Sequence, residues 1–386
     1  KSNMNTKIFI SLIALSTLTL TNCKKKCNNP SAINFEEKGE CEFVSFEKNN
    51  LLENLVYNYI TPSLDQYVID VNSLHTSSSD FESNPSLTSL TSLRDSWKNA
   101  LLTWQDVALF NFGPSDFYVH LISTNDFPTD EYNLNQNITS GNTSISTMAS
   151  SDVKGFPALD YLLHQPNKTD QQIVDYFIDN NNAKEYLLAI TSDLKDRGNN
   201  VRNMWDQEYI DEFISDENTS TGSSISLIVN GFCQYFEKNL RSGKLGIPLD
   251  ALNPDFNDLY PTYVECYYYG QSIPFAVRAL EAVKKYFNGI SYSSNEEDNM
   301  GLDDYIDNAG ASADANTSLH EKIDELLEQS IIGFNALEDP LSERVAADDP
   351  AANELWTKLQ ELAILFKIDM TSALGVTITY QDNDGD

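Results

Sequence analysis

Apolar residues recur at steps of three and four along most of this chain, and that spacing constrains its fold more than any other feature. In the first long stretch they are Leu51, Leu52, Leu55, Val56, Tyr59, Ile60, Leu64, Tyr67, Val68 and Val71. The spacing places them on one face of an amphipathic helix, which Pro62 is expected to kink or interrupt. The pattern returns over residues 225–240, 273–287, 319–337 and 355–374. Only residues 376–380 resemble a short β segment, so the sequence predicts an all-α fold of helix bundles.

Polar stretches separate these helical segments. Loops are predicted where the chain is rich in Ser, Thr, Asn or acidic residues, over 76–92, 133–150 and 293–316. The polar, glycine-containing segment 216–224 is the candidate domain boundary. We therefore predict two helical-bundle domains packed together, at residues 46–215 and 216–386.

The charge of the chain excludes several classes of partner. Its 58 acidic residues outnumber 25 Lys and Arg residues, which gives a formal net charge of −33. A surface this acidic repels phosphate backbones and anionic lipid faces, so no nucleic-acid partner is expected. It attracts cations and supplies carboxylates as hard-metal ligands. The chain has only 4 His residues, which argues against a site built from several imidazoles.

The N-terminal segment has the features of a targeting sequence. Lys7 precedes about a dozen mostly apolar residues, a run too short to span a bilayer as a helix of ~20 residues. The run ends at Cys23, and this junction resembles a bacterial lipobox, in which the cysteine becomes the acylated first residue. We predict a signal peptide over residues 1–22 and lipidation at Cys23, which would anchor the chain to the outer membrane. The alternative is an ordinary secretory signal that happens to precede a cysteine.

Four cysteines remain, and an exported chain meets an oxidising compartment, so disulfide bonds are expected. The segment from Cys27 to Cys41 resembles the short cysteine-bounded tether that follows the anchor in some Gram-negative surface lipoproteins. The resemblance implies a Cys27–Cys41 bridge within a tether at residues 23–45. Cys233 and Cys266 either pair or stay buried and reduced.

Four segments, taken in order, resemble the imelysin family, the M75 peptidase family of exported bacterial lipoproteins associated with iron uptake. They are Trp97 to Trp104 with Phe112-Gly113-Pro114, then Lys154 to Leu163, then Gly243 to Leu249 with Val264-Glu265-Cys266 and Ser272, and finally Leu374 to Asp386. The resemblance runs from about residue 46 to the end of the chain. It implies two helical-bundle domains with a shared site near their interface.

The family signature G-x-H-x-x-E is altered in this chain. Gly155 matches, but Pro157 stands in place of the histidine and Asp160 in place of the glutamate. A histidine and a carboxylate three residues apart on a helix could hold a metal ion or act as a base beside an electrophile. Proline has no side-chain ligand or transferable proton, so chemistry that depends on the imidazole cannot survive unchanged. Pro157 does fit the first turn of a helix.

Other motifs offer competing sites. His164 lies one turn after Asp160 and could replace the missing imidazole, or it could simply cap the helix end. The stretch from His320 to Asp324 resembles H-E-x-x-H with Asp in the last place, although an acid in a first helical turn is ordinary capping chemistry. The acidic tail at residues 382–386 resembles part of a calcium loop but ends before the bidentate glutamate.

The sequence thus favours a ligand-binding, imelysin-like lipoprotein linked to iron uptake over an enzyme. The predicted ligand-binding residues are Gly155, Pro157, Asp160, Glu265 and Ser272. The ligand or cofactor would be a divalent metal or another iron species, with Asp160 and His164 as weak candidate metal ligands. The alternative is an M75-type metallopeptidase with a site rebuilt from His164 or His320, and a purely structural surface module is a third possibility.

Overall fold

The computed structural model describes residues 26–27, 36–39, 46–165, 167–252, 258–294 and 299–381. It divides the chain into two units, residues 1–45 and residues 46–386. In the first unit Cys27 takes part in a disulfide bond. Its predicted partner Cys41 and the predicted lipidation site Cys23 lie outside the described residues, so that pairing and the lipid anchor stay predictions.

Helices make up most of the second unit, and its described residues include no strand, which confirms the predicted all-α class. The first half contains α1 (Lys48–Asn54), η1 (Leu55–Ile60), α2 (Thr61–Ser83), α3 (Leu87–Val107), α4 (Pro114–Phe117), α5 (His120–Thr124), α6 (Glu131–Ser140), η2 (Met148–Val153), α7 (Gly155–Leu163), α8 (Asp170–Asp179), α9 (Asn181–Met204) and α10 (Gln207–Ser215). The second half contains α11 (Ser224–Gln234), η3 (Tyr235–Gly246), η4 (Pro261–Tyr263), α12 (Ile273–Phe287), α13 (Leu302–Asn308), α14 (Leu319–Ala336), α15 (Leu341–Ala346), α16 (Pro350–Ile364), η5 (Leu365–Met370) and α17 (Thr371–Leu374).

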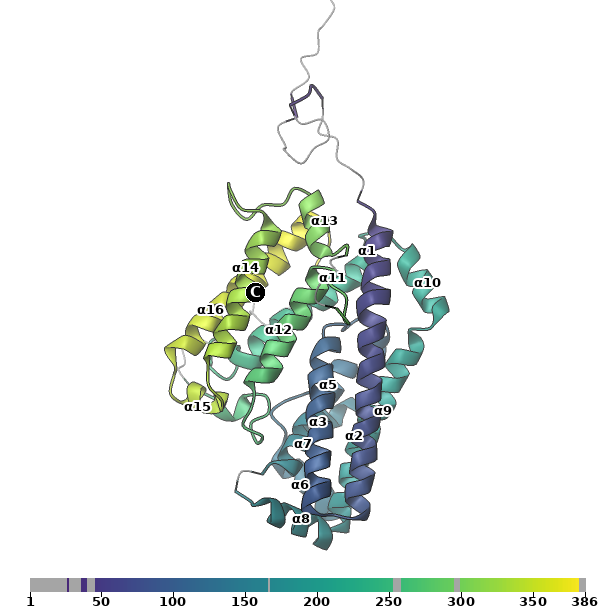
Figure 1. Cartoon of the computed structure of the whole chain (residues 1–386), viewed down its shortest axis with the longest axis vertical. Helices are drawn as coiled ribbons and strands as arrows, with labels where there is room; N and C mark the ends of the chain where they lie inside the picture. The colour runs from purple at the N-terminus through teal and green to yellow at the C-terminus, as the bar shows by residue number, and fades with distance from the viewer. Residues whose placement is uncertain are drawn as a thin grey trace, which may run out of the picture. The chain divides into compact units, whose positions relative to one another are not determined.

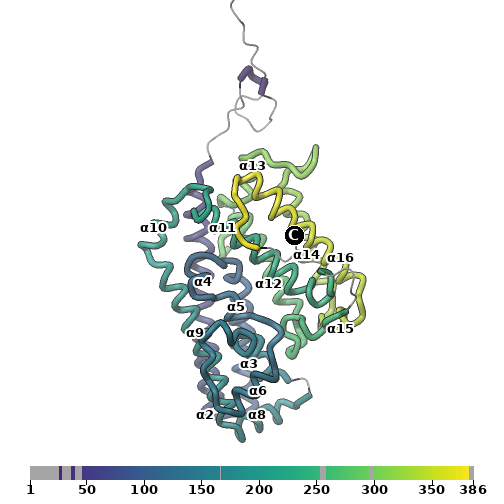
Figure 2. The backbone as a smooth tube through the Cα atoms, turned by 180° about the vertical axis from the view of Figure 1, so that it is seen from behind, coloured from purple at the N-terminus to yellow at the C-terminus, as the bar shows by residue number. Residues whose placement is uncertain are grey.

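These helices form two bundles that lie side by side (Figures 1 and 2). In the first, α2 packs against α3 and α9; in the second, α14 packs against α12 and α16. Contacts between α12 and α3 join the bundles, and buried apolar residues from both belong to one continuous core. The predicted boundary at 216–224 falls in the non-helical link between α10 and α11, and the division into two domains there stays a prediction.

The first long helix runs through Pro62 rather than stopping there. Residues Leu55–Ile60 form a π-helical segment just before it. Proline has no N–H to donate to the carbonyl four residues back, which belongs to Asn58. That carbonyl instead accepts a hydrogen bond of 2.8 Å from the backbone N–H of Tyr292. A contact with a distant loop therefore satisfies the carbonyl that the proline leaves free.

Two of the predicted loops are largely helical, so those predictions were wrong. Helix α2 extends to Ser83 and α3 begins at Leu87, and within them Ser and Thr hydroxyls donate to the carbonyl four residues back, as Ser78 does to Leu74 at 2.8 Å. This local bonding lets serine-rich sequence stay helical when one face is buried. Helix α6 and the 3-10 segment η2 occupy much of 133–150, and α13 lies within 293–316.

The predicted β segment at 376–380 is also not a strand. It is extended, but its hydrogen bonds go to the side chain of Asn230 on α11. The Asn230 amide donates to the Thr377 carbonyl at 3.1 Å and accepts from the Thr379 N–H at 2.7 Å. The alternating Val, Ile and Tyr pattern at 376–380 therefore belongs to a segment that is hydrogen-bonded to α11 rather than to another strand. Among the described residues, no helix is both long and apolar enough to cross a membrane.

Candidate functional site

Helix α7 carries the altered signature, and its first residue is fixed by sterics. Gly155 has φ +73°, and a Cβ built on it would lie 2.3 Å from the carbonyl oxygen of Thr124, at the end of α5. Only glycine fits so close to another backbone. Pro157 follows in the first turn, as predicted, and is buried. Both residues shape the start of the helix, and neither offers a side-chain group to a ligand.

Asp160 anchors a loop from the other half of the chain. Its side chain is buried, with the residue 3% exposed, and its two oxygens accept hydrogen bonds from the backbone N–H groups of Tyr268 at 3.0 Å and Tyr269 at 2.9 Å. Burial raises the pKa of the Asp160 carboxyl, while His164 and the two N–H groups oppose the shift. The carboxylate thus serves as an acceptor for loop residues 264–272, which we call the tyrosine loop.

Glu265 lies at the start of the tyrosine loop and fastens it to the first bundle. It is buried and forms an ion pair of 2.5 Å with Lys244 on η3. Its other oxygen accepts from Gln105 at 3.1 Å and from Asn125 at 2.7 Å. Because the carboxylate is fully partnered, removing a single member of this network would leave a buried charge or amide unsatisfied.

Ser272 closes the other end of the tyrosine loop. Its hydroxyl donates to the carbonyl of Glu265 at 2.5 Å, and its backbone N–H donates to Asp339 at 3.0 Å. Of the five residues predicted as ligand-binding, Asp160, Glu265 and Ser272 therefore lie at the junction of α7 with the tyrosine loop, and Gly155 and Pro157 lie at the start of the same helix. The side chains of Asp160, Glu265 and Ser272 form hydrogen bonds with one another's segments and with the surrounding chain, and these bonds maintain the junction.

His164 has free hydrogen-bonding capacity at this junction. Its Nδ1 lies 3.2 Å from an Asp160 oxygen, within ion-pair distance although the ring N–H is not aligned for a hydrogen bond. The ring packs between Trp97 and Tyr269, with centroid separations of 4.7 and 4.8 Å. The side chain is only 7% exposed, and its Nε2 has no hydrogen-bond partner within the described chain. Buried polar atoms are seldom left this way unless something else binds them.

A cleft of about 420 Å³ lies beside His164, a volume in the range of small-ligand sites. It is lined by Thr91, Arg94, Asp95, Lys98, His164, Gln165, Lys168, Asp170, Tyr268 and Tyr269. We call it the His164 cleft. Helix α3, the end of α7 and the start of α8 form its walls together with the tyrosine loop, so both halves of the chain contribute, as expected for a site near the bundle interface.

The other three histidines do not line this cleft. His75 contacts Thr191 at 3.0 Å, and complete burial lowers the pKa of His120 to about 3, which keeps that ring neutral. His320 pairs with Asp307 at 2.6 Å. In the motif that resembled H-E-x-x-H, the first acid belongs to a capping box with Ser318 and the last accepts from Asn288, so the motif serves the helix start and its packing.

The residues present do not fit the metal site that the family signature implies. Pro157 supplies no ligand, and both Asp160 oxygens already accept backbone hydrogen bonds. In the described part of the chain, no group of three or more His, Cys, Asp or Glu side chains is placed to hold a metal ion. The tail at 382–386 lies outside the described residues, so its calcium-loop resemblance stays untested. Cys233 and Cys266 are free and buried, which settles the alternative left open for them.

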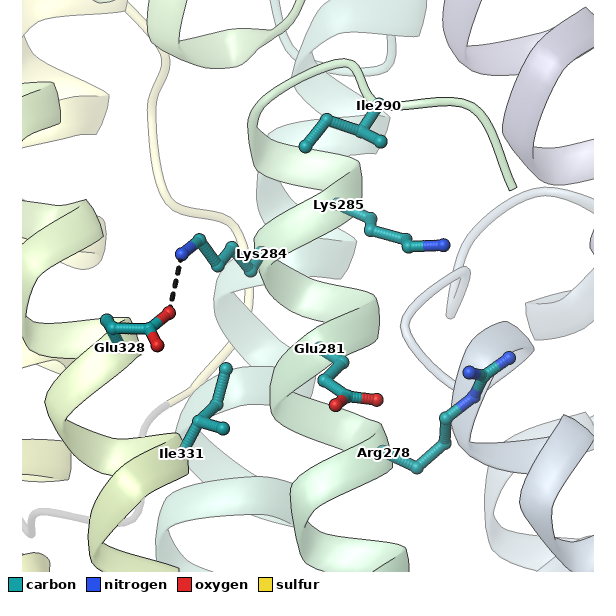
Figure 3. Close-up of a pocket in the computed structure, with 7 residues that line it drawn as sticks. All are labelled: Arg278, Glu281, Lys284, Lys285, Ile290, Glu328 and Ile331. Carbon is teal, nitrogen blue, oxygen red and sulfur yellow. Dashed lines mark hydrogen bonds and ion pairs between the residues drawn. The ribbon is translucent and has the colours of Figure 1, made fainter. Parts of the chain in front are cut away.

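A second cleft, of about 430 Å³, lies between α12 and α14. Figure 3 shows Lys284 pointing toward Glu328 on α14, and the two form an ion pair of 2.8 Å. Arg278 points to the other side of α12, where its Nε lies 2.7 Å from the buried Asp106 of α3. Because these charges already have partners, this cleft is a weaker candidate than the His164 cleft.

The Asp106–Arg278 pair should make stability depend on pH. Burial raises the pKa of Asp106 from 3.8 to about 6, although Arg278 and Tyr292 oppose the shift. Since the folded chain then binds this proton more tightly than the unfolded chain, the contribution is present below pH 4 and is lost as pH rises through 6. Relative to Asp106→Asn, the parent should lose up to about 3 kcal/mol of unfolding free energy between pH 4 and pH 7. Urea denaturation at four pH values checks this, and parallel curves for the two proteins would contradict it.

Sequence reasoning missed the residues that shape the cleft. Lys98 lies one residue after Trp97, and Tyr268 and Tyr269 contribute backbone N–H groups, which no side-chain motif reports. Arg94 binds the carbonyl of Leu163 and the carboxylate of Asp170. The available signal was the position of Lys98 directly after Trp97, within the first of the four family-like segments.

Comparisons with known proteins agree with this fold. The imelysin family model (Peptidase_M75) matches residues 60–366. The structure of a protein described as an iron-regulated protein A precursor, from Parabacteroides distasonis, aligns with a TM-score of 0.71 at 17% identity, over 84% of this chain and 94% of that one.

An imelysin-like protein from Psychrobacter arcticum aligns with a TM-score of 0.64 at 16% identity, over 86% of this chain and 97% of that one. At these identities, the structural matches establish the fold alone. No curated protein matches the sequence. Because the family model covers most of the chain, the protein is a member of the imelysin family.

Proposed function

We propose that this protein is an exported lipoprotein that binds a small ligand in the His164 cleft and contributes to iron uptake. The observation that carries the proposal is the buried His164, whose Nε2 has no hydrogen-bond partner within the described chain, beside a cleft of ligand size. The anchoring of the tyrosine loop by Asp160 supports it, because a rigid loop gives the cleft a preformed wall. The link to iron rests on family membership and on the description of the related structure as iron-regulated.

A loading experiment tests this function. The detergent-solubilised chain is incubated separately with ferrous iron and with ferric citrate, desalted, and assayed for iron. We expect about one iron per chain to be retained from ferric citrate, little from ferrous iron, and less from ferric citrate after His164→Gln. His75→Gln is the matched control, because that histidine lies outside the cleft lining. No retained iron from either form, or equal retention in both variants, would contradict the proposal.

The second candidate function is an M75-type peptidase with a rebuilt site. The observation in its favour is the Asp160–His164 pair, since a carboxylate beside Nδ1 is a common way to orient a catalytic or metal-bound imidazole. Hydrolysis of an unstructured protein such as casein, abolished by His164→Gln and retained in His75→Gln, would favour this function over ligand binding.

Cys23 should determine where the protein is found. In a Cys23→Ser variant we expect the chain to move to the soluble fraction or to remain unprocessed, because the acyl chains that hold it in the membrane cannot be attached. Detergent phase partition of the parent and the variant measures this. Identical partition of the two would mean that the anchor is absent or lies elsewhere.

A further inference from the structure

The His164 cleft is basic, although the chain as a whole is strongly acidic. The formal net charge is −33, and acidic residues outnumber Lys and Arg by more than two to one. In the cleft lining the cations are in the majority, with side chains from Arg94, Lys98 and Lys168 against carboxylates from Asp95 and Asp170. The local positive charge of the cleft differs from the negative charge of the rest of the protein. Such a local field favours the binding of negatively charged ligands in the cleft.

Two of the cations are already engaged. Arg94 donates from Nε to the carbonyl of Leu163 at 2.9 Å and from Nη1 to Asp170 at 2.9 Å, which fixes its position at the cleft wall. The ammonium group of Lys168 lies 4.7 Å from the centroid of the Tyr176 ring. Both contribute positive charge to the cleft while their preferred contacts stay within the protein.

Lys98 and His164 can each form further hydrogen bonds. Lys98 lines the cleft and has no hydrogen bond or ion pair within the described part of the chain. In a protein with this excess of carboxylates, an unpaired lysine beside a buried histidine is an unusual combination. Both are able to donate hydrogen bonds to a ligand that occupies the cleft.

The position of Asp160 determines which ring atom of His164 can meet a ligand. Nδ1 faces the Asp160 carboxylate at 3.2 Å, so Nε2, which has no hydrogen-bond partner within the described chain, is the atom left for a ligand in the cleft. Among the side chains that line the cleft, the cations of Arg94, Lys98 and Lys168 outnumber the carboxylates of Asp95 and Asp170, which disfavours a bare metal cation there. The surroundings therefore favour an anion over a cation.

We infer that the His164 cleft binds a carboxylate or phosphate group of a small anionic ligand, with Lys98 and His164 as the direct donors. Arg94 acts as a positioning residue that holds the end of α7 and adds positive charge. Tyr268 and Tyr269 also line the cleft, and its volume of about 420 Å³ admits a polycarboxylate. This inference rests on the proposed ligand-binding function and names the chemical class of the ligand.

Titration calorimetry with iron-free citrate and with inorganic phosphate tests the inference. The detergent-solubilised chain is titrated at low and at physiological salt as the parent and as Lys98→Gln, Lys98→Arg and Lys184→Gln. We expect one site per chain for at least one anion, about fivefold or more weaker in Lys98→Gln and weakened further by salt. Lys98→Arg should retain most of the affinity. Lys184→Gln removes the same charge from α9, outside the cleft lining, and should stay within about twofold of the parent.

Each outcome is decisive. Binding of citrate but not phosphate assigns a carboxylate, and the reverse assigns a phosphate. Absence of binding for both anions, or affinity equal in Lys98→Gln and Lys184→Gln, would overturn the inference. Because neither probe contains iron, Lys98-dependent anion binding without retention of iron in the loading experiment would uphold the anion site and reject the iron link.

Discussion

A Gly155→Ala variant should be destabilised by about 3 kcal/mol or more, and a substantial fraction of it should fail to fold. At φ +73° an alanine costs about 1–2 kcal/mol from backbone strain alone. Its Cβ would also lie 2.3 Å from the Thr124 oxygen and 2.8 Å from the Thr124 carbonyl carbon, and both atoms belong to a backbone that cannot rotate away. Urea denaturation followed by circular dichroism measures the loss of unfolding free energy.

Gly375→Ala is the matched control for that prediction. Gly375 has a similar φ of +65°, but a Cβ there would meet nothing within 4 Å. Its alanine variant should therefore show the strain cost alone, about 1 kcal/mol. Equal losses in the two variants would mean that the close approach of α7 to α5 is not maintained in solution.

An Asp160→Ala variant should release the tyrosine loop. Removing the carboxylate leaves the N–H groups of Tyr268 and Tyr269 without acceptors, and each buried unpaired group costs about 1–3 kcal/mol. We expect an overall loss of about 3 kcal/mol and faster hydrogen exchange at residues 264–272, with the helices of both bundles still protected. Hydrogen exchange read by mass spectrometry measures this peptide by peptide.

Asp175→Ala serves as the control, because that aspartate is exposed on α8 and accepts a hydrogen bond from Gln171 on the same helix. It should change stability by no more than about 0.5 kcal/mol and leave exchange in the tyrosine loop unaltered. If exchange in the loop were also unaltered in Asp160→Ala, the loop would be held by Glu265 and Ser272 alone, and the role assigned to Asp160 would be wrong.

The sequence was informative about the fold wherever burial is periodic. The stripe from Leu51 to Val71 predicted a helix that the structure contains, because side-chain spacing alone decides which face is buried. The same reasoning failed at 76–92 and 376–380, where serine hydroxyls and the Asn230 side chain satisfy the backbone. Those partners depend on tertiary geometry, and a local pattern does not reveal them.

The candidate site shows the same limit. The altered signature located α7, and the segment around Glu265 located the loop that meets it. The sequence could not show that both oxygens of Asp160 would accept hydrogen bonds from the backbone N–H groups of Tyr268 and Tyr269. Those residues lie more than a hundred positions away along the chain. Nor could the sequence show that Lys98 and the Nε2 atom of His164 would lack hydrogen-bond partners beside one cleft, because such contacts are decided by the packing of α3 against α7.

One measurement tests the central claim most directly. The claim is that Asp160 anchors the tyrosine loop beside a cleft for an anionic ligand, and that Asp160 does not bind a metal ion. Zinc and iron(II) are titrated calorimetrically into the detergent-solubilised parent and into Asp160→Asn and Asp175→Asn variants. The account predicts only weak, multi-site heats from the acidic surface, alike in all three proteins. Tight binding of one metal ion per chain by the parent, lost in Asp160→Asn and kept in Asp175→Asn, would show that Asp160 is a metal ligand and would contradict the account.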